Sequence, residues 1–577
     1  MRELLRAARR EEPSDLLLKG GRFANVFTME YETADIAVKD GIIVGIGEGY
    51  EAAEVVDCSG GTIVPGFIDG HMHVESTFMT PRNLAATIVP LGTTTIMPDP
   101  HEIANTCGME GIRFMYAESQ GLPLDIYYGA PSCVPASNFE TPREMLTAKN
   151  IRELFDEGIC THLGEMMNYP DVYLGNRDVW SKLEAAKGKI ITGHAPQLEG
   201  ADLIAYILGG PSCDHECESI ENALEKLRLG MWLMVRQGAT ARNLTALAPL
   251  IRENEFLTTR AMAVSDDISP DFIRQRGHMN GCIRELIAEG VSPLAALRMT
   301  TFSPAEYFQL FDRGAIAPGR IADIVLLDTL ESCKAKKVWK RGNLVAENGK
   351  LVLPIEGADS RRFPGNKNSV PMPLLQEIEV RPPKNAIKAP RINVIGTIRG
   401  QVITKRLEMT PTVKDGLITA DPDRDIAKLV VVEKNQGTGR TAVGFVHNYG
   451  MKRGAIASSI AHDAHNYTCI GADDTSIKKA LDTLYAMGGG IVLTDGDLVL
   501  AKLELPVGGL MSTLPFDELC AETAKLAEAR KILNPDNAEA FMQLSFLSLS
   551  VIPELKLTDQ GYCDISAGGA QPLFVED

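Results

Sequence analysis

Long apolar runs are missing from this chain of 577 residues. No stretch reaches the ~18–20 residues that a membrane-spanning helix needs. The first segment, Met1 to Pro13, is charged and lacks the apolar core of a signal peptide. We therefore expect no membrane partner and a cytoplasmic location.

An excess of positive charge is also missing. The 58 lysine and arginine residues are outnumbered by 76 aspartate and glutamate residues, which gives a formal net charge of −18. Such a surface repels nucleic-acid phosphates and anionic membranes, so we expect neither as a partner. A small neutral substrate is compatible with this charge.

The cysteines lack the pattern of a disulfide framework. There are 11, an odd number, scattered along a long chain, and we interpret them as reduced thiols. Cys213 and Cys217 flank His215, but no second cysteine pair follows to complete a structural zinc site.

The length predicts several domains, since one domain usually takes roughly 100–200 residues. Short apolar runs bounded by glycine and aspartate, from Asp15 to Gly60, predict antiparallel strands and hairpins. The runs Ile321–Leu327 and Lys337–Trp339 would return to this sheet. We predict a small β-sandwich domain from residues 1–62 plus 319–353.

Strand-like and helical patterns alternate between Thr62 and about Asp267. Eight candidate strands with helices between them predict a (β/α)8 barrel over residues 63–318. The candidate strands are Ile63–Ile68, Thr93–Met97, Ile126–Tyr128, Ile159–Leu163, Lys189–Thr192, Gly210–Cys213, Met231–Val235 and Leu257–Val264.

Proline is concentrated after the barrel, in residues 354–390, which is a linker composition. Residues 391–577 are long enough for a C-terminal domain, which we expect to be α+β. The predicted class is thus an α/β protein: a (β/α)8 barrel with a small β-sandwich domain and a C-terminal α+β domain.

Polar residues with metal-binding side chains stand at the C-terminal ends of the candidate strands, where barrel enzymes place their active sites. A lone histidine there is more often structural, but four histidines and two carboxylates together indicate a metal site. Imidazoles combined with carboxylates suit Zn, Fe or Mn. The six residues are His71, His73, Glu165, His194, His215 and Asp266.

The order His-x-His, Glu, His, His, Asp, with the motif Pro65–His73 at its start, resembles the amidohydrolase superfamily. Many members carry a carboxylated lysine at the strand-four position, where this chain has Glu165. The sequence around this glutamate resembles the adenine deaminase family within the superfamily. The similarity extends through nearly the whole chain. Further motifs that carry it are His73–Ser76, Pro98–Glu102, Gly164–Asn168, Gly277–Asn280 and His462–Asn466.

This resemblance implies a site with two metal ions per subunit, Mn²⁺ or Fe²⁺, with Zn²⁺ also compatible. A hydroxide that bridges the metals would add to C6 of adenine and release hypoxanthine and ammonia, a purine-salvage reaction. Asp266 would carry the proton to the departing amine, and Glu165 would share this task. One metal would be bound by His71, His73, Glu165 and Asp266, and the other by Glu165, His194 and His215. The resemblance also leads us to expect a homo-oligomer.

Two positions depart from the family pattern. Gln237, in Arg236-Gln237-Gly238, stands where a glutamate is common, and Ile268 stands where a basic residue often follows the paired aspartates. Neither change removes a predicted metal ligand. They leave open a deaminase of another aminopurine.

Several further side chains are candidates for the site. His101, Glu102 and Asp267 are candidate substrate-binding residues. His462 and His465 would either form a metal-binding pair or cap a loop, and the spacing favours the loop. We expect His162, within a candidate strand, to point into packing.

Other functions stay open at this point. A cyclic-amide hydrolase on the same barrel commonly uses the bridging lysine, which Glu165 argues against. A catalytically silent barrel is disfavoured because every predicted ligand is present. His73-Val74-Glu75 matches the H-x-E of zinc nucleobase deaminases, but the P-C-x-x-C half of that signature is absent.

Overall fold

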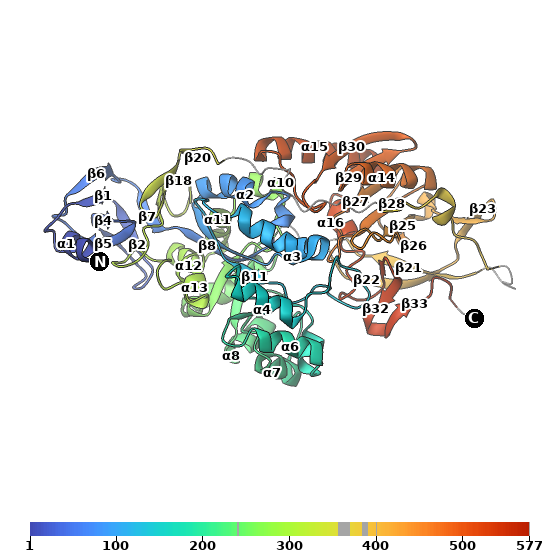
Figure 1. Cartoon of the computed structure of the whole chain (residues 1–577), viewed down its shortest axis with the longest axis horizontal. Coiled ribbons are helices and arrows are strands. Elements are labelled where there is room, and N and C mark those ends of the chain that lie inside the picture. The colour runs from blue at the N-terminus through green and yellow to red at the C-terminus, as the bar shows by residue number, and fades with distance from the viewer. Residues whose placement is uncertain (239–241, 356–369, 384–389, 400, 576–577) are drawn as a thin grey trace.

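The computed structural model describes residues 1–238, 242–355, 370–383, 390–399 and 401–575. These residues form three parts in a row: N-terminal sheets at one end, a barrel in the middle and a C-terminal region at the other end (Figure 1). Part of the predicted linker, residues 356–369 and 384–389, lies outside the described residues. Within the described residues, no helix has the length and apolar character needed to cross a membrane.

The N-terminal part contains two sheets that enclose an apolar core with Leu16, Phe23 and Trp339. The predicted return of the later strands is confirmed, because β17 pairs antiparallel with β7. The predicted antiparallel strands and hairpin are present, since β4 pairs antiparallel with both β1 and β5. The prediction was wrong for two pairs, because β1 pairs with β6, and β2 with β7, in parallel. One sheet has the order β5-β4-β1-β6, from β5 (Ile42–Ile46), β4 (Ile36–Lys39), β1 (Ser14–Lys19) and β6 (Ala52–Asp57). The other has the order β20-β19-β18-β17-β7-β2-β3, from β20 (Lys350–Leu351), β19 (Asn343–Glu347), β18 (Ala335–Lys340), β17 (Ile324–Leu327), β7 (Thr62–Pro65), β2 (Arg22–Asn25) and β3 (Glu30–Thr33).

The predicted (β/α)8 barrel is confirmed. Parallel strands follow one another around it, and a bridge between Met72 and Asp266 joins the last strand to the first. The strands are β8 (Phe67–Met72), β9 (Thr93–Pro98), β10 (Asp125–Ile126) with β11 (Tyr128–Ala130), β12 (Cys160–Met166), β13 (Ile191–Gly193), β14 (Cys213–Asp214), β15 (Trp232–Arg236) and β16 (Ala261–Val264).

Three predicted strands need correction. The run Ile63–Ile68 is split at Gly66, where the chain leaves the N-terminal sheet and enters the barrel; a Cβ at this position would lie 2.2 Å from the hydroxyl of Thr94. The run Ile126–Tyr128 is likewise divided between β10 and β11. The start of Leu257–Val264 is a 3-10 helix, Glu255–Thr259, stabilised by local hydrogen bonds such as Thr258 Oγ1 to the Glu255 carbonyl (2.7 Å).

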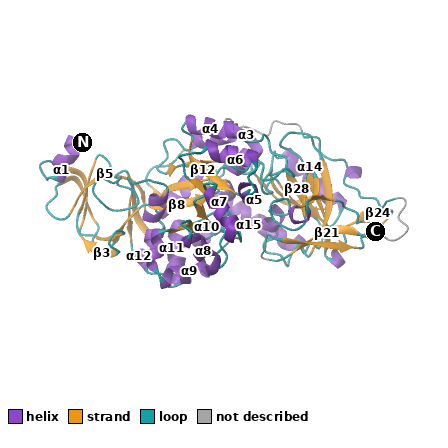
Figure 2. Ribbon diagram, turned by 90° about the horizontal axis from the view of Figure 1, so that it is seen from below, coloured by secondary structure: helices purple, strands orange, loops and turns teal. Residues whose placement is uncertain are grey.

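Helices surround the barrel strands (Figure 2). Several begin at serine caps, which accept a backbone N–H of the first turn; Ser219, Ser269 and Ser292 are examples. The helices of this part are α2 (Pro81–Ile88), α3 (His101–Glu118), α4 (Ala148–Asp156), α5 (Tyr169–Tyr173), α6 (Arg177–Ala185), α7 (Gly200–Leu208), α8 (Ile220–Arg228), α9 (Leu244–Glu253), α10 (Pro270–Arg276), α11 (Met279–Ala288), α12 (Pro293–Met299) and α13 (Phe302–Tyr307).

The C-terminal region is built on an eight-stranded sheet with the order β22-β21-β26-β25-β28-β27-β29-β30. Its pairs are antiparallel except for β21 with β26, and α14 packs on it through Ile477 and Leu481, which confirms the α+β prediction. The region contacts the barrel, since Ser512 N–H donates to the Phe78 carbonyl at 2.8 Å. The elements are β21 (Ile392–Thr397), β22 (Thr404–Met409), β25 (Ile426–Val432), β26 (Thr441–His447), β27 (Ala455–Ser458), β28 (Tyr467–Gly471), α14 (Asp474–Ala486), β29 (Gly490–Asp495), β30 (Leu498–Glu504), α15 (Phe516–Leu533) and α16 (Ala540–Ser545).

Candidate metal centre

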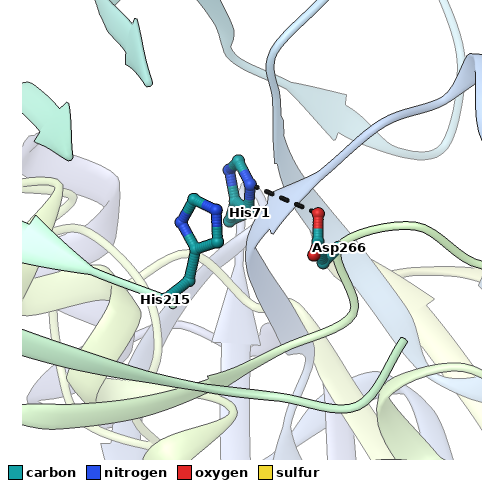
Figure 3. Close-up of side chains that lie close together, drawn as sticks. All are labelled: His71, His215 and Asp266. Carbon is teal, nitrogen blue, oxygen red and sulfur yellow. Dashed lines mark ion pairs between the residues drawn. The ribbon is translucent and has the colours of Figure 1, made fainter. Parts of the chain in front are cut away.

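The six predicted ligands meet at one end of the barrel, although they come from five strands. His71 and Glu165 lie within β8 and β12. His73, His194 and His215 directly follow β8, β13 and β14, and Asp266 lies two residues beyond the end of β16. All are buried except His194, whose side chain is 21% exposed. Figure 3 shows three of them, with the imidazoles of His71 and His215 beside the carboxylate of Asp266.

The carboxylate of Glu165 stands between two groups of histidines. Its Oε1 lies 3.4 Å from His73 Nε2 and 4.0 Å from His71 Nε2. Its Oε2 lies 2.9 Å from His194 Nδ1 and 3.2 Å from His215 Nε2. One oxygen therefore faces each group, which is the arrangement of a carboxylate that bridges two cations.

Asp266 completes the first group. Its Oδ1 lies 3.3 Å from His73 Nε2 and 3.6 Å from His71 Nε2, while its Oδ2 accepts a hydrogen bond from Arg236 at 2.9 Å. Burial alone would raise the pKa of Asp266, but the Arg236 guanidinium and the histidines hold this pKa well below its usual value. The carboxyl group is thus ionised and able to bind a cation or accept a proton.

The donor set fits divalent metal ions. His73 Nδ1 is 3.1 Å from the Asp99 carbonyl oxygen, which can only accept, so the Nε2 lone pair faces the carboxylates. A metal-binding histidine is usually oriented in this way. The Nε2 atom of His71 is buried and has no hydrogen-bond partner. The ligand atoms of His71, His73 and Glu165, and those of Glu165, His194 and His215, lie within 4.8 Å of one another.

The chain is similar to known proteins along nearly its whole length. The model of the amidohydrolase family matches residues 62–346, and that of the adenine deaminase C-terminal domain matches residues 401–568. Adenine deaminase 2 of Carboxydothermus hydrogenoformans is 41% identical over 99% of both chains. Adenine deaminase of Oleidesulfovibrio alaskensis is 42% identical over 100% of this chain and 99% of its own.

The chain belongs to the adenine deaminase family. It is a metal-dependent hydrolase, because the amidohydrolase family to which the barrel belongs uses a divalent metal. A crystal structure described as an adenine deaminase is 16% identical and covers 57% of this chain and 99% of its own, with a TM-score of 0.44.

Asp99 holds the backbone of Glu165 in place. Its Oδ2 accepts the backbone N–H of Glu165 at 2.8 Å. The carboxylate approaches so closely that a Cβ on Gly164 would lie 2.3 Å from it. Only glycine can therefore precede Glu165 without displacing Asp99.

Asp69 holds the loop that carries Asp266. It accepts the backbone N–H of Ser265 at 3.1 Å, and the Ser265 hydroxyl donates to it as well. His278 Nε2 lies 3.0 Å from the same carboxylate. These contacts fix Asp266, whose φ of +57° is uncommon for a residue other than glycine.

Two acidic residues near the second group were missed by the sequence reasoning. Asp214 accepts the Ala195 N–H at 2.8 Å and the Lys226 ammonium at 2.8 Å. Glu216 Oε1 lies 3.3 Å from His215 Nε2, and Arg236 donates to it. Both residues are next to His215 in the sequence, and this position could have indicated that they lie near the site.

The three candidate substrate-binding residues also lie beside the centre. The ring of His101 meets that of His73 edge-on at 4.8 Å, and its Nδ1 is 3.7 Å from Glu165 Oε1. The Ser76 hydroxyl lies between Glu102, at 3.2 Å, and Asp267. Gln237, one of the departures from the family pattern, donates to Glu285.

The side chain of His162 packs inside the barrel, as predicted. Its ring lies edge-on to Phe308 at 5.0 Å, and burial lowers the pKa of His162 to about 4.

The low pKa of His162 predicts a pH dependence of stability. Because His162 in the unfolded chain binds a proton near the ordinary pKa of 6.5, the stability of the wild type should fall as the pH drops from 6.5 towards 4. We expect the variant His162→Phe to lose this part of the dependence, roughly 2 kcal/mol at a pH of about 5. Thermal unfolding of both proteins at two pH values measures it. An unchanged pH dependence, or a loss of bound metal, would contradict the packing role.

Proposed function

We propose that the protein converts adenine and water into hypoxanthine and ammonia. The observation that carries this proposal is the carboxylate of Glu165, placed between two pairs of histidines. The proposed reaction is also supported by relatives named adenine deaminase, which match nearly the full length of the chain. A cyclic-amide hydrolase is disfavoured, because those enzymes commonly bridge their metals with a modified lysine.

The proposal includes two divalent cations, Mn²⁺ or Fe²⁺, for each chain. When bound, such ions act as Lewis acids and lower the pKa of a water molecule towards neutrality. The first would be held by His71, His73, Glu165 and Asp266, and the second by Glu165, His194 and His215.

The proton transfers are assigned to the protein's own carboxyl groups. Asp266, kept ionised by Arg236, accepts a proton from the water that attacks C6 of the purine. It returns this proton to the amine as the bond between C6 and nitrogen breaks, so that ammonia leaves. Arg236 therefore acts on catalysis through Asp266.

Glu102 is the residue that we assign to the purine ring. Burial, together with the nearby carboxylates of Glu75 and Asp267, raises the pKa of Glu102 well above its usual value. A carboxyl group that keeps its proton can donate a hydrogen bond to a ring nitrogen. Asp267 shares the Ser76 hydroxyl with Glu102 and lies on the same side of the cluster.

Ammonia and hypoxanthine formation from adenine tests the proposal directly. We expect protein purified with manganese to be active, to lose activity when a chelator removes the metal, and to regain it at two equivalents of Mn²⁺ per chain. Ammonia would be measured by a coupled assay and hypoxanthine by chromatography. No turnover with either Mn²⁺ or Fe²⁺ would reject adenine, and other aminopurines and then cyclic amides would be tested.

A further inference from the structure

A segment of the C-terminal region lies against the candidate substrate residues of the barrel. It comprises residues 461–466, between β27 and β28, and we call it the mouth loop. His465 is fully buried and His462 is 7% exposed. Their rings approach Glu102: His462 Nδ1 lies 3.7 Å from Oε1 and His465 Nε2 lies 3.9 Å from Oε2.

The barrel holds the mouth loop in place through Glu140. One carboxylate oxygen accepts the backbone N–H groups of Asp463 and Ala464, at 3.3 and 3.2 Å. The other accepts the N–H of Ser550 at 3.0 Å and also its hydroxyl. The loop is therefore fixed to the barrel by hydrogen bonds that do not involve its histidines.

The hydrogen bonding of His465 determines which ring nitrogen carries the proton. The backbone N–H of Ala461 points at Nδ1, with 3.1 Å between the two nitrogens. Since a backbone N–H can only donate, Nδ1 must be the acceptor, and the proton of the neutral ring is on Nε2. That Nε2 is buried and has no hydrogen-bond partner. It is a donor aimed at Glu102.

The same contacts weigh against a third metal site. Glu102, His462 and His465 are close enough together to hold a cation. A metal ion would bind the lone pair of His465 Nε2, so the proton of the neutral ring would have to be on Nδ1. This N–H would then face the backbone N–H of Ala461, and two donors cannot form a hydrogen bond. The geometry therefore favours a hydrogen-bond donor over a ligand.

We propose that His465 is a positioning residue for the substrate, because its Nε2–H orients the carboxyl group of Glu102 towards the purine. The C-terminal region thereby supplies part of the substrate site of the barrel. Ser76 donates to Oε1 of the same carboxyl group at 3.2 Å, and His465 Nε2 faces Oε2 at 3.9 Å, so each oxygen has one donor on its side. This inference rests on the proposed function, since it assigns Glu102 to the purine ring.

Two variants separate this role from a simple loop cap. In His465→Asn, the amide oxygen takes the place of Nδ1 and keeps the bond to Ala461, but nothing reaches Glu102. In His465→Gln, the amide nitrogen takes the place of Nε2 and keeps the donor. Asn also tolerates the φ of +52° at this position, so a defect in that variant would not come from the backbone.

We expect His465→Asn to raise KM for adenine on the order of 10-fold, because a Glu102 carboxyl group that is no longer oriented would lose its hydrogen bond to the purine ring. We expect His465→Gln to stay within about 3-fold of wild type in KM, because this variant keeps a donor that faces Glu102. Both should bind two equivalents of manganese and unfold at temperatures close to that of wild type. Steady-state kinetics measures KM, metal analysis measures the bound manganese, and thermal unfolding measures the stability of each variant.

Three results would overturn the proposal. If His465→Asn kept the KM of wild type while His465→Gln lost activity, the role of His465 would be to cap the loop. Loss of a third equivalent of metal in either variant would assign it to a metal site. Unchanged kinetics in both variants, with an active wild type, would reject His465 and leave the proposed function standing. A wild type inactive on adenine would reject the proposed function, and this inference with it.

Discussion

The variant Glu165→Gln is expected to lose at least about 1,000-fold in kcat/KM for adenine, because the proposed Lewis-acid chemistry depends on both of the proposed cations. The amide of glutamine has one acceptor oxygen and one NH₂ group. The NH₂ group can only donate, so it could not bind a cation beside the pair of histidines that it faces. At present one oxygen is 3.4 Å from His73 and the other is 2.9 Å from His194. Bound manganese should fall below two equivalents per chain.

Metal analysis and steady-state kinetics on the same preparation measure both effects. Glu157→Gln is the matched control, since that carboxylate forms an ion pair with Arg113 at the surface, where such pairs contribute little. We expect the control to keep full activity. Two equivalents of metal and kcat/KM within tenfold of wild type in Glu165→Gln would disprove the bridging role.

The variant Lys226→Met is expected to have the largest effect on stability, a loss of about 3–5 kcal/mol, which is usual when one partner of a buried ion pair is removed. The Lys226 ammonium donates to Asp214 at 2.8 Å and to the Ala195 carbonyl at 2.6 Å. Both charged side chains are at most 2% exposed. Without the ammonium, the carboxylate would stay buried with no opposite charge beside it.

Chemical unfolding of the metal-loaded protein measures this loss. The control is Lys187→Met, an exposed lysine, for which we expect a change within about 0.5 kcal/mol. Activity should fall in Lys226→Met as well, because Asp214 and Ala195 adjoin His215 and His194, two of the proposed metal ligands. A stability loss below about 1 kcal/mol would show that Asp214 is compensated in another way.

The six predicted ligands could be found in the sequence for a physical reason. Side chains two residues apart in a strand point the same way, which places His71 and His73 together. The carboxyl ends of barrel strands meet at one face, which brings Glu165 and Asp266 to them. Neither argument requires knowledge of how the remote parts of the chain pack.

Other features depend on packing and could not be predicted. The apolar run through Gly66 continues without a break, because the two sheets that it joins are both buried. The contact between Glu140 and Asp463 joins residues more than 300 positions apart, and no local pattern reports such a contact. The 3-10 helix Glu255–Thr259 arises from local hydrogen bonds that compete with the strand pattern.

The candidate metal centre is unevenly buried, which determines the side from which small molecules can reach it. His194 is 21% exposed, whereas His71, His73 and His215 are each at most 4% exposed. The mouth loop lies against Glu102. Adenine, ammonia and small chelators would therefore approach and leave past His194, and the cation on that side would exchange first.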